Sequence, residues 1–110
     1  MNYTVNISSE AAADLRAIFE YIAFELRSAQ NASSQLARLE KEIYALNQMP
    51  ERYRRYGEEP WHSRGLRLMP VDNYCVFYIP NHEAKVVNIV RVIYGGRDIA
   101  SELEKYTAEG

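Results

Sequence analysis

The chain has 110 residues, of which 47% are hydrophobic and 25% are charged, and its formal net charge is −2. Such a length and composition predict one folded domain, 1–110, and exclude a disordered chain or a second core. The apolar runs are too short to cross a bilayer, and the single cysteine, Cys75, cannot form an internal disulfide, which favours the reducing cytoplasm.

The charges are unevenly distributed along the chain. Residues 1–51 carry four basic and seven acidic side chains, and residues 98–110 carry one basic and four acidic ones, so each of these segments sums to −3. Residues 52–67, which we call the basic segment, carry five arginines and two glutamates, a sum of +3. The sequence therefore excludes a uniformly basic nucleic-acid-binding protein and predicts one basic patch between acidic flanks.

The first half of the chain predicts a strand followed by two amphipathic helices. Residues 3–7 alternate apolar and polar side chains, as a half-buried strand does. A helix is then predicted from Ser9 to about Arg27, with a hydroxyl of Ser8 or Ser9 as its cap and an apolar stripe of Leu15, Ile18, Phe19, Ile22 and Leu26. After a polar break, 28–34, with Asn31 as the expected cap, a second stripe predicts the partner helix of an antiparallel hairpin: Leu36, Leu39, Ile43 and Leu46.

The stretch from Gly65 to Asp98 predicts a three-stranded antiparallel meander. Three runs of β-branched and aromatic residues, 66–69, 74–79 and 86–94, are separated by turn clusters that contain Pro, Asn and Asp. A short helix over 99–106, capped by Asp98, follows. The expected fold class is therefore α+β, with the N-terminal strand and the helical hairpin packed on a mainly antiparallel sheet.

The last strand is apolar on both of its predicted faces. Strict alternation places Val87, Ile89, Arg91 and Ile93 on one face and the remaining apolar residues on the other. The hairpin covers one face, and the other is either covered by the C-terminal helix or left open to a partner's segment. Arg91, buried among apolar residues, needs a carboxylate, and Glu20 or Glu42 of the hairpin is expected to supply it.

Residues 51–64 are interpreted as an ordered surface loop, and the basic segment interleaves cationic and aromatic side chains. This pattern suits single-stranded nucleic acid, because guanidinium groups attract phosphate and rings stack on bases. It suits an acidic partner protein equally well, and a third reading is a loop whose rings are anchored in the core. The candidate target- or RNA-binding residues are Arg52, Arg54, Arg55, Trp61, Arg64 and Arg67. Two scattered histidines and one cysteine give no metal-binding pattern.

In the order of its motifs, the chain resembles the RelE/ParE superfamily of type II toxin–antitoxin toxins. The resemblance lies in the helix over 9–22, in the hairpin Gly65-Leu66-Arg67 to Tyr78, and in the run from Val90 to Asp98. It covers about residues 3–100. It implies a small cytoplasmic toxin that arrests growth, stabilises a plasmid and is neutralised by the C-terminal segment of a cognate antitoxin, with no cofactor.

The resemblance implies two possible targets, since RelE-like members cut ribosome-bound messenger RNA and ParE-like members inhibit DNA gyrase. RNA cleavage needs a general base, cations for the phosphate and an acid for the leaving oxygen. At the positions of the family's lysines and arginine this chain has Leu66, Leu68 and Cys75, and at the position of a family aromatic it has Leu103. Arg97 matches a family arginine, and the candidate catalytic residues are Arg97, Tyr94 and Tyr106.

These mismatches and the long hairpin favour a ParE-like toxin that binds gyrase without chemistry of its own. Two alternatives remain open at this point. The first is a RelE-like endoribonuclease that uses Arg97 with Tyr94 or Tyr106, and the second is a non-toxic or decayed binding domain. For the antitoxin, either the sheet or the hairpin is the expected contact surface.

Overall fold

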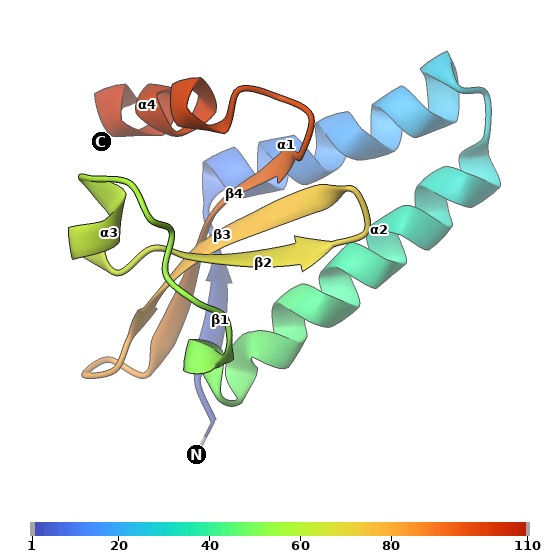
Figure 1. The fold of residues 1–110 in the computed structure, drawn as a ribbon. Coiled ribbons are helices and arrows are strands. Elements are labelled where there is room, and N and C mark those ends of the chain that lie inside the picture. The colour runs from blue at the N-terminus through green and yellow to red at the C-terminus, as the bar shows by residue number, and fades with distance from the viewer. Residues whose placement is uncertain (1, 110) are drawn as a thin grey trace.

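The computed structural model describes the backbone of residues 2–109 and the side chains of residues 2–105. It shows a single sheet with helices on both of its faces (Figure 1). The strands are β1 (Thr4–Ile7), β2 (Arg67–Val71), β3 (Tyr74–Asn81) and β4 (Val86–Tyr94). The main helices are α1 (Ser9–Glu20), the π-helix η1 (Tyr21–Glu25), α2 (Ala29–Tyr44), α3 (Trp61–Arg64) and α4 (Ile99–Glu109). Two 3-10 turns, η2 (Ala45–Asn47) and η3 (Pro50–Arg52), follow α2.

The four strands lie in the order β1-β4-β3-β2. The meander of β2, β3 and β4 is antiparallel, as predicted, while β1 pairs with β4 in parallel. The helical hairpin carries the chain from β1 to β2 at the opposite edge of the sheet, and the two turns of the meander then bring β4 beside β1 in the same direction. The predicted α+β class is therefore confirmed, with a mixed sheet.

The helical hairpin begins and turns where polar side chains cap it. The Ser8 hydroxyl accepts a hydrogen bond from the backbone N–H of Ala11, as predicted. The second helix begins earlier than the sequence suggested, because the Ser28 side chain caps it by accepting from the N–H of Asn31. The prediction that Asn31 is the cap was therefore wrong, and Asn31 lies inside α2.

The end of the first helix departs from the predicted stripe. A π-helix closes at Leu26, whose N–H donates to the Tyr21 carbonyl five residues earlier. Because one extra residue in a turn rotates all that follow by roughly 100°, the stripe leaves the core here. Leu26 was predicted to face the core and is instead 58% exposed, whereas Ile22 stays buried.

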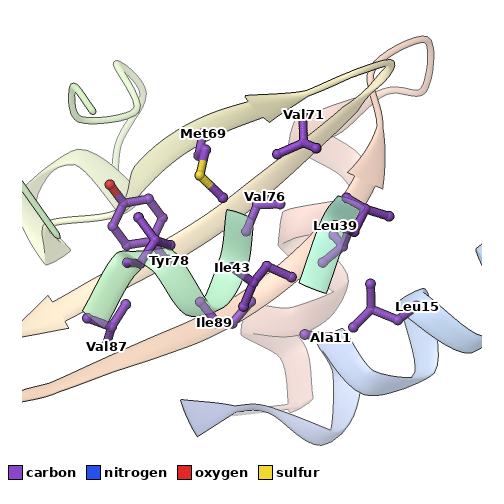
Figure 2. Close-up of a cluster of buried hydrophobic side chains, with 12 residues drawn as sticks. Ala11, Leu15, Leu39, Ile43, Met69, Val71, Val76, Tyr78, Val87 and Ile89 are labelled. Carbon is purple, nitrogen blue, oxygen red and sulfur yellow. The ribbon is translucent and has the colours of Figure 1, made fainter. Parts of the chain in front are cut away.

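The hairpin covers one face of the sheet and forms the larger core cluster with it (Figure 2). From the hairpin, this cluster contains Leu15 of α1 and Leu39 and Ile43 of α2. The strands contribute the facing side chains, among them Met69, Val71, Val76, Tyr78, Val87 and Ile89. The predicted apolar stripe of α2 is therefore confirmed as a core-facing surface.

A β-bulge in β4 changes which side chains face the hairpin. Phe77 of β3 pairs with Arg91, but the next residue, Tyr78, pairs with Ile89, so Val90 is an extra residue on β4. Val90 lies opposite Ile89, as strict alternation predicts, and the alternation shifts by one after Val90: Val92 joins the hairpin-side cluster, and Ile93 joins the cluster on the opposite face. The predicted faces of β4 are correct before the bulge and wrong after it.

The second face of the sheet is covered by the protein's own chain. Here Phe77 and Ile93 of the sheet pack with Trp61 of α3, Leu66 and Leu103 of α4, all of them buried. Figure 1 shows α3 and α4 on this side of the sheet, opposite the hairpin. Of the two alternatives for this face, the structure therefore shows the covered one rather than an open apolar patch.

At two places along the edges of the sheet, side chains or a loop satisfy backbone groups that no neighbouring strand pairs with. Beyond the end of β1, the carbonyl of Val90 accepts from the Ser8 hydroxyl, and the Val92 N–H donates to the Asp14 carboxylate at 2.9 Å. On β2, the backbone of the basic segment pairs through the N–H of Leu68, which donates to the Arg54 carbonyl. Two residues further along this same edge, Pro70 has no N–H to offer.

Candidate functional site

Arg91 holds together three elements at the end of β4. Its guanidinium donates to both oxygens of Asp14 on α1, at 2.7 and 2.9 Å. It also reaches α4, where it donates to the Glu102 carboxylate at 3.2 Å and to the Glu102 carbonyl at 2.9 Å. The prediction that Arg91 is paired is confirmed, but the expected partners, Glu20 and Glu42, were wrong because the bulge turns Arg91 toward α1 and α4.

The electrostatics of this cluster favour its charged forms. The hydrogen bond with Asp14 raises the pKa of Arg91 above its ordinary value. Lys105, which donates to the Glu102 carboxylate at 3.0 Å, lowers the pKa of Glu102, and Arg91 lowers it further. The side chains of Arg91, Asp14 and Glu102 are all mostly shielded from solvent, so the cluster is a structural clasp of α1, β4 and α4.

Within the basic segment, Arg67 and Trp61 have structural contacts. The Arg67 guanidinium donates to the carbonyl oxygens of Tyr53 and Glu51, at 2.6 and 3.2 Å, and so ties η3 and the following chain to β2. The Trp61 ring is buried under the second sheet face. Both residues were predicted as target contacts, and the structure places both in interactions within the chain.

The other arginines of the basic segment differ in their availability. Arg52 donates to the Ala45 carbonyl at 3.2 Å, and the Arg64 guanidinium lies 5.0 Å from the centre of the Trp61 ring. Arg54 and Arg55 are exposed, and among residues 2–105 their side chains make neither an ion pair nor a hydrogen bond. They line a cleft of about 700 Å³ with Arg52, Tyr53, Tyr56, Gly57, Leu68 and Pro70.

A larger groove of about 780 Å³ lies between the helical hairpin and the end of the sheet. We call it the hairpin groove. Its apolar walls come from α1, η1 and β4, and include Ile18, Tyr21, Ile22, Leu26 and Val92. Its polar walls come from α2 and the β2–β3 turn, where Arg38 and Gln35 both donate to the Asp72 carboxylate, at 2.8 and 2.9 Å. These contacts lower the pKa of Asp72, first through Arg38.

The hairpin groove gathers three tyrosines and the exposed arginine Arg97. The rings of Tyr74 and Tyr94 meet edge to face, 5.8 Å apart, and Tyr21 lines the same groove. Burial raises the pKa of Tyr74, and the neighbouring phenols of Tyr94 and Tyr21 raise it further. Arg97 follows the Gly95–Gly96 break at the groove's rim, and no carboxylate among residues 2–105 lies within ion-pair distance of it.

Two of the three candidate catalytic residues therefore lie in one place. Arg97 and Tyr94 both line the hairpin groove. The side chain of Tyr106 lies outside the described residues. The Gly96 backbone lies against the Tyr94 ring, where an added Cβ would come within 2.6 Å of a ring carbon, so this glycine allows the close turn after β4.

The positions that a RelE-like ribonuclease would use form an apolar surface instead. Leu66 is fully buried, and Leu68 and Cys75 pack against the same second-face cluster, under α3 and α4. Burial raises the pKa of the Cys75 thiol, which keeps it neutral. Leu103, at the position of a family aromatic, is buried in this cluster too. None of these four side chains can act as a general base or a phosphate-binding cation.

Sequence reasoning missed the hairpin groove and the apolar side chains beside it. Tyr21 and Tyr74 were not selected as candidates, and Phe24, which is 71% exposed on η1, was not either. Three tyrosines that lie 53 and 20 positions apart along the chain show no spacing that marks a shared site. Phe24 and Leu26 carry a weak signal, because they are large apolar side chains next to the polar break between the helices.

The structure offers no other chemical centre in the part of the chain that it describes. Within residues 2–105, no three His, Cys, Asp or Glu side chains are grouped as ligands for a metal ion. No described helix combines the length and hydropathy that a membrane span requires.

Comparisons with known proteins give one family and several structural relatives. The model of the ParE toxin of the type II toxin–antitoxin system parDE matches residues 5–99. No curated protein sequence matches the chain. Among solved structures, the chromosomal ParDE system from P. aeruginosa has a TM-score of 0.70 at 20% identity, with 84% of this chain and 95% of that chain covered.

Two further solved structures are similar in fold. The toxin–antitoxin complex RelBE2 from Mycobacterium tuberculosis has a TM-score of 0.66 at 20% identity, covering 86% of this chain and 92% of that chain. A mutant of the E. coli toxin RelE in the free state has a TM-score of 0.65 at 17% identity, covering 99% and 97%. At these identities the structures establish a shared fold, and the match to the family model extends over most of the chain.

Proposed function

Because the chain belongs to the ParE toxin family of type II toxin–antitoxin systems, we propose that it inhibits DNA gyrase and is neutralised by a cognate antitoxin. The toxin acts in the cytoplasm, where gyrase is found, and stops growth by binding its target rather than by cutting RNA. Maintenance of a plasmid that carries the module would follow from this toxicity.

The second face of the sheet is the observation that supports a gyrase inhibitor over a ribonuclease. Leu66, Leu68, Cys75 and Leu103 stand where the resemblance to RelE-like members places cationic or aromatic groups. These side chains pack under α3 and α4 and present no titratable group that is charged at neutral pH. A surface of this kind has nothing with which to take a proton from a 2′-hydroxyl or to neutralise a phosphate.

For contact with the target, we propose the available part of the basic segment. Arg54 and Arg55 project from the cleft beside β2 and are free of ion pairs and side-chain hydrogen bonds within the described side chains. Arg52 and Arg64 border them, while Trp61 and Arg67 act by holding the segment in place. An acidic surface of the target is the expected counterpart, because arginine is enriched at interface hot spots.

A supercoiling assay tests this proposal. Purified chain at micromolar concentration is expected to block supercoiling of relaxed plasmid by gyrase. The double variant Arg54→Glu and Arg55→Glu is expected to weaken inhibition by about tenfold or more, since each reversed charge meets a like charge on the target. Arg16→Glu, an exposed arginine on α1 outside both clefts, is the matched control and is expected to inhibit as the unmodified chain does.

The same preparations separate the alternatives. If supercoiling continues while ribosome-bound messenger RNA is cut, and Arg97→Ala abolishes the cutting, the chain is a RelE-like endoribonuclease and the proposal is wrong. If expression of the chain alone leaves growth, supercoiling and messenger RNA intact, the chain is a non-toxic binding domain.

A further inference from the structure

The first part of the basic segment is fixed by backbone hydrogen bonds along the outer edge of the sheet. The Tyr56 N–H donates to the Leu66 carbonyl at 2.8 Å, and the Leu68 N–H donates to the Arg54 carbonyl at 3.3 Å. Between these two bonds, Arg55 forms an antiparallel bridge with the first residue of β2. Figure 1 shows this stretch passing β2 before the chain enters α3. Its arginines are therefore held on an ordered backbone, which lowers the entropy cost of binding.

The cleft beside this edge is cationic, and no carboxylate of the described residues lines it. Three arginines line the cleft and no Asp or Glu does, a sum of +3. The neighbouring carboxylates have partners within the chain: Glu58 accepts from the Tyr56 hydroxyl at 3.1 Å, and Glu51 lies 3.7 Å from a ring nitrogen of His82. An anion that enters the cleft would therefore gain contacts with the exposed arginines without breaking an ion pair.

The aromatic rings of the basic segment are committed to the fold. The Tyr56 ring meets Phe77 edge to face with 5.6 Å between the ring centres, and Trp61 is buried. Tyr53 packs against the larger core cluster. Binding of single-stranded nucleic acid depends on bases that stack on free rings, so a single strand is a poor fit here. In a duplex the phosphates lie outside, and arginines alone are enough to contact them.

The cleft also lacks the apolar centre that protein interfaces have. Among residues 2–105, none of the large apolar side chains that are exposed lines it: Tyr21, Phe24, Leu26, Tyr44, Met49 and Tyr94. Protein interfaces place aromatic and aliphatic anchors at a desolvated centre, whereas interfaces with DNA are polar and positively charged. The guanidinium group also matches phosphate oxygens in a bidentate geometry. The composition of the cleft therefore favours phosphate groups over the surface of a protein.

We propose that the basic segment binds the sugar–phosphate backbone of duplex DNA, with Arg54 and Arg55 on phosphate oxygens and Arg52 at the border of the contact. This inference rests on the proposed function, because the duplex is the DNA on which gyrase acts, and it identifies the acidic counterpart of the segment as phosphate. So few contacts bind weakly by themselves, but gyrase that holds both the toxin and the duplex raises their effective concentration. Contacts to phosphates carry no sequence information, so any duplex is bound.

An NMR titration of the full chain with short duplexes tests the inference. Amide signals of residues 52–57 and 66–69 are expected to shift, and two duplexes of unrelated sequence are expected to bind alike. Two phosphate contacts release about two counterions, so the Kd is expected to rise about tenfold between about 50 and 200 mM salt. Absence of these shifts at the lower salt concentration would overturn the inference.

A pair of double variants separates the arginines of the cleft from net charge. Arg54→Glu with Arg55→Glu is expected to raise the Kd for the duplex about tenfold or more, because both phosphate contacts are replaced by repulsion. Arg16→Glu with Arg27→Glu changes the net charge equally, at two exposed arginines outside the cleft. Because exposed charges more than about 10 Å apart are screened, this control is expected to stay within about twofold of the unmodified chain.

Two further ligands distinguish phosphate on a duplex from the other possible partners. Equal losses in both double variants, or tighter binding of a single strand than of the duplex, would overturn the inference. So would a polyglutamate peptide of the same charge that binds the cleft as tightly as the duplex, since the counterpart would then be a protein surface. Supercoiling by gyrase is measured separately. A chain that inhibits gyrase without binding the duplex loses only this inference, and one that binds the duplex without inhibiting gyrase loses only the proposed target.

Discussion

The basic segment and the hairpin groove both contain tyrosines and arginines, but the structure uses them differently. In the basic segment, Arg67 and Arg52 donate to backbone carbonyls, and Arg64 lies over the buried Trp61 ring. In the groove, Tyr21, Tyr94 and Arg97 leave much of their surface to solvent or to a partner. Three of the five arginines of the basic segment thus serve the fold and leave Arg54 and Arg55 exposed, whereas the groove keeps Tyr21, Tyr94 and Arg97 available.

This difference shows that residue types alone do not identify a binding surface. An arginine is available to a partner only if the chain leaves it without acceptors, which depends on backbone geometry rather than on the local sequence. Changes in the clasp, or at Arg67 of the basic segment, should therefore affect stability. Changes at Arg54 and Arg55, or at the exposed side chains of the groove, should affect binding. Four experiments challenge this comparison, from the largest expected effect to the smallest.

Replacement of Arg91 by alanine should have the largest effect on stability. It leaves the Asp14 carboxylate shielded and without its cation and Glu102 with Lys105 alone, so the free energy of unfolding is expected to fall by about 3 kcal/mol. Chemical denaturation measures this, with Arg54→Ala as the control that should change little. A near-equal stability of the two variants would show that the clasp does not hold α4 and α1 to β4.

Replacement of Arg67 by alanine should destabilise the fold by about 2 kcal/mol, because hydrogen bonds to a charged group contribute about 1.5–3 kcal/mol. The carbonyls of Tyr53 and Glu51 would lose their shared donor. Thermal unfolding measures the loss. If Arg67→Ala kept its Tm but lost gyrase inhibition, Arg67 would be a target contact and the comparison would fail for the basic segment.

Replacement of Tyr78 by phenylalanine should cost about 1 kcal/mol. The buried Tyr78 hydroxyl donates to the Pro50 carbonyl at 2.7 Å, and burial raises its pKa to about 12, so it stays a neutral donor. Urea denaturation measures the effect, and Tyr94→Phe, whose ring is half exposed, is the control. If Tyr94→Phe lost more stability than Tyr78→Phe, the Tyr94 hydroxyl in the groove would contribute more to stability than the buried Tyr78 hydroxyl.

The smallest effect concerns pH. Because its contacts lower the pKa of Glu102 in the folded chain, this carboxylate adds stability above its unfolded pKa, and the contribution is lost as the pH falls through the folded value. Stability should therefore decline below about pH 4.5, by on the order of 0.5 kcal/mol for this group. The Glu102→Gln variant should lose less stability between neutral pH and low pH than the unmodified chain does. If both lose the same amount, other carboxylates cause the decline.

Much of the architecture followed from the sequence because its patterns are local. The apolar stripe of α2, the presence of two turns in the meander and a serine cap at the start of α1 each depend on residues within a few positions, and each was predicted correctly. The turns begin two residues later than predicted, because Pro70–Val71 and Pro80–Asn81 still belong to β2 and β3. The resemblance of the motifs, taken in chain order, then led from the predicted fold to the toxin family. Apolar residues on both faces of β4 also predicted that both faces need cover, and the structure provides it.

The site was less predictable because it depends on departures from those patterns. The extra residue at Val90 shifted the faces of β4, and the π-helix turned Leu26 outward. Neither insertion has a clear sequence signal, since both keep ordinary apolar residues. The partners of Arg91 and the meeting of Tyr21, Tyr74 and Tyr94 depend on contacts distant in sequence, which a single chain without an alignment does not show.

Closure of strand edges has a consequence for how the toxin behaves without its partner. The Asp14 carboxylate occupies the Val92 N–H beyond the end of β1, and on β2 the Arg54 carbonyl occupies the N–H of Leu68 before Pro70 interrupts the row of donors. At these two places a second copy finds no free donor with which to continue the sheet. The chain is thereby protected there from polymerising edge to edge.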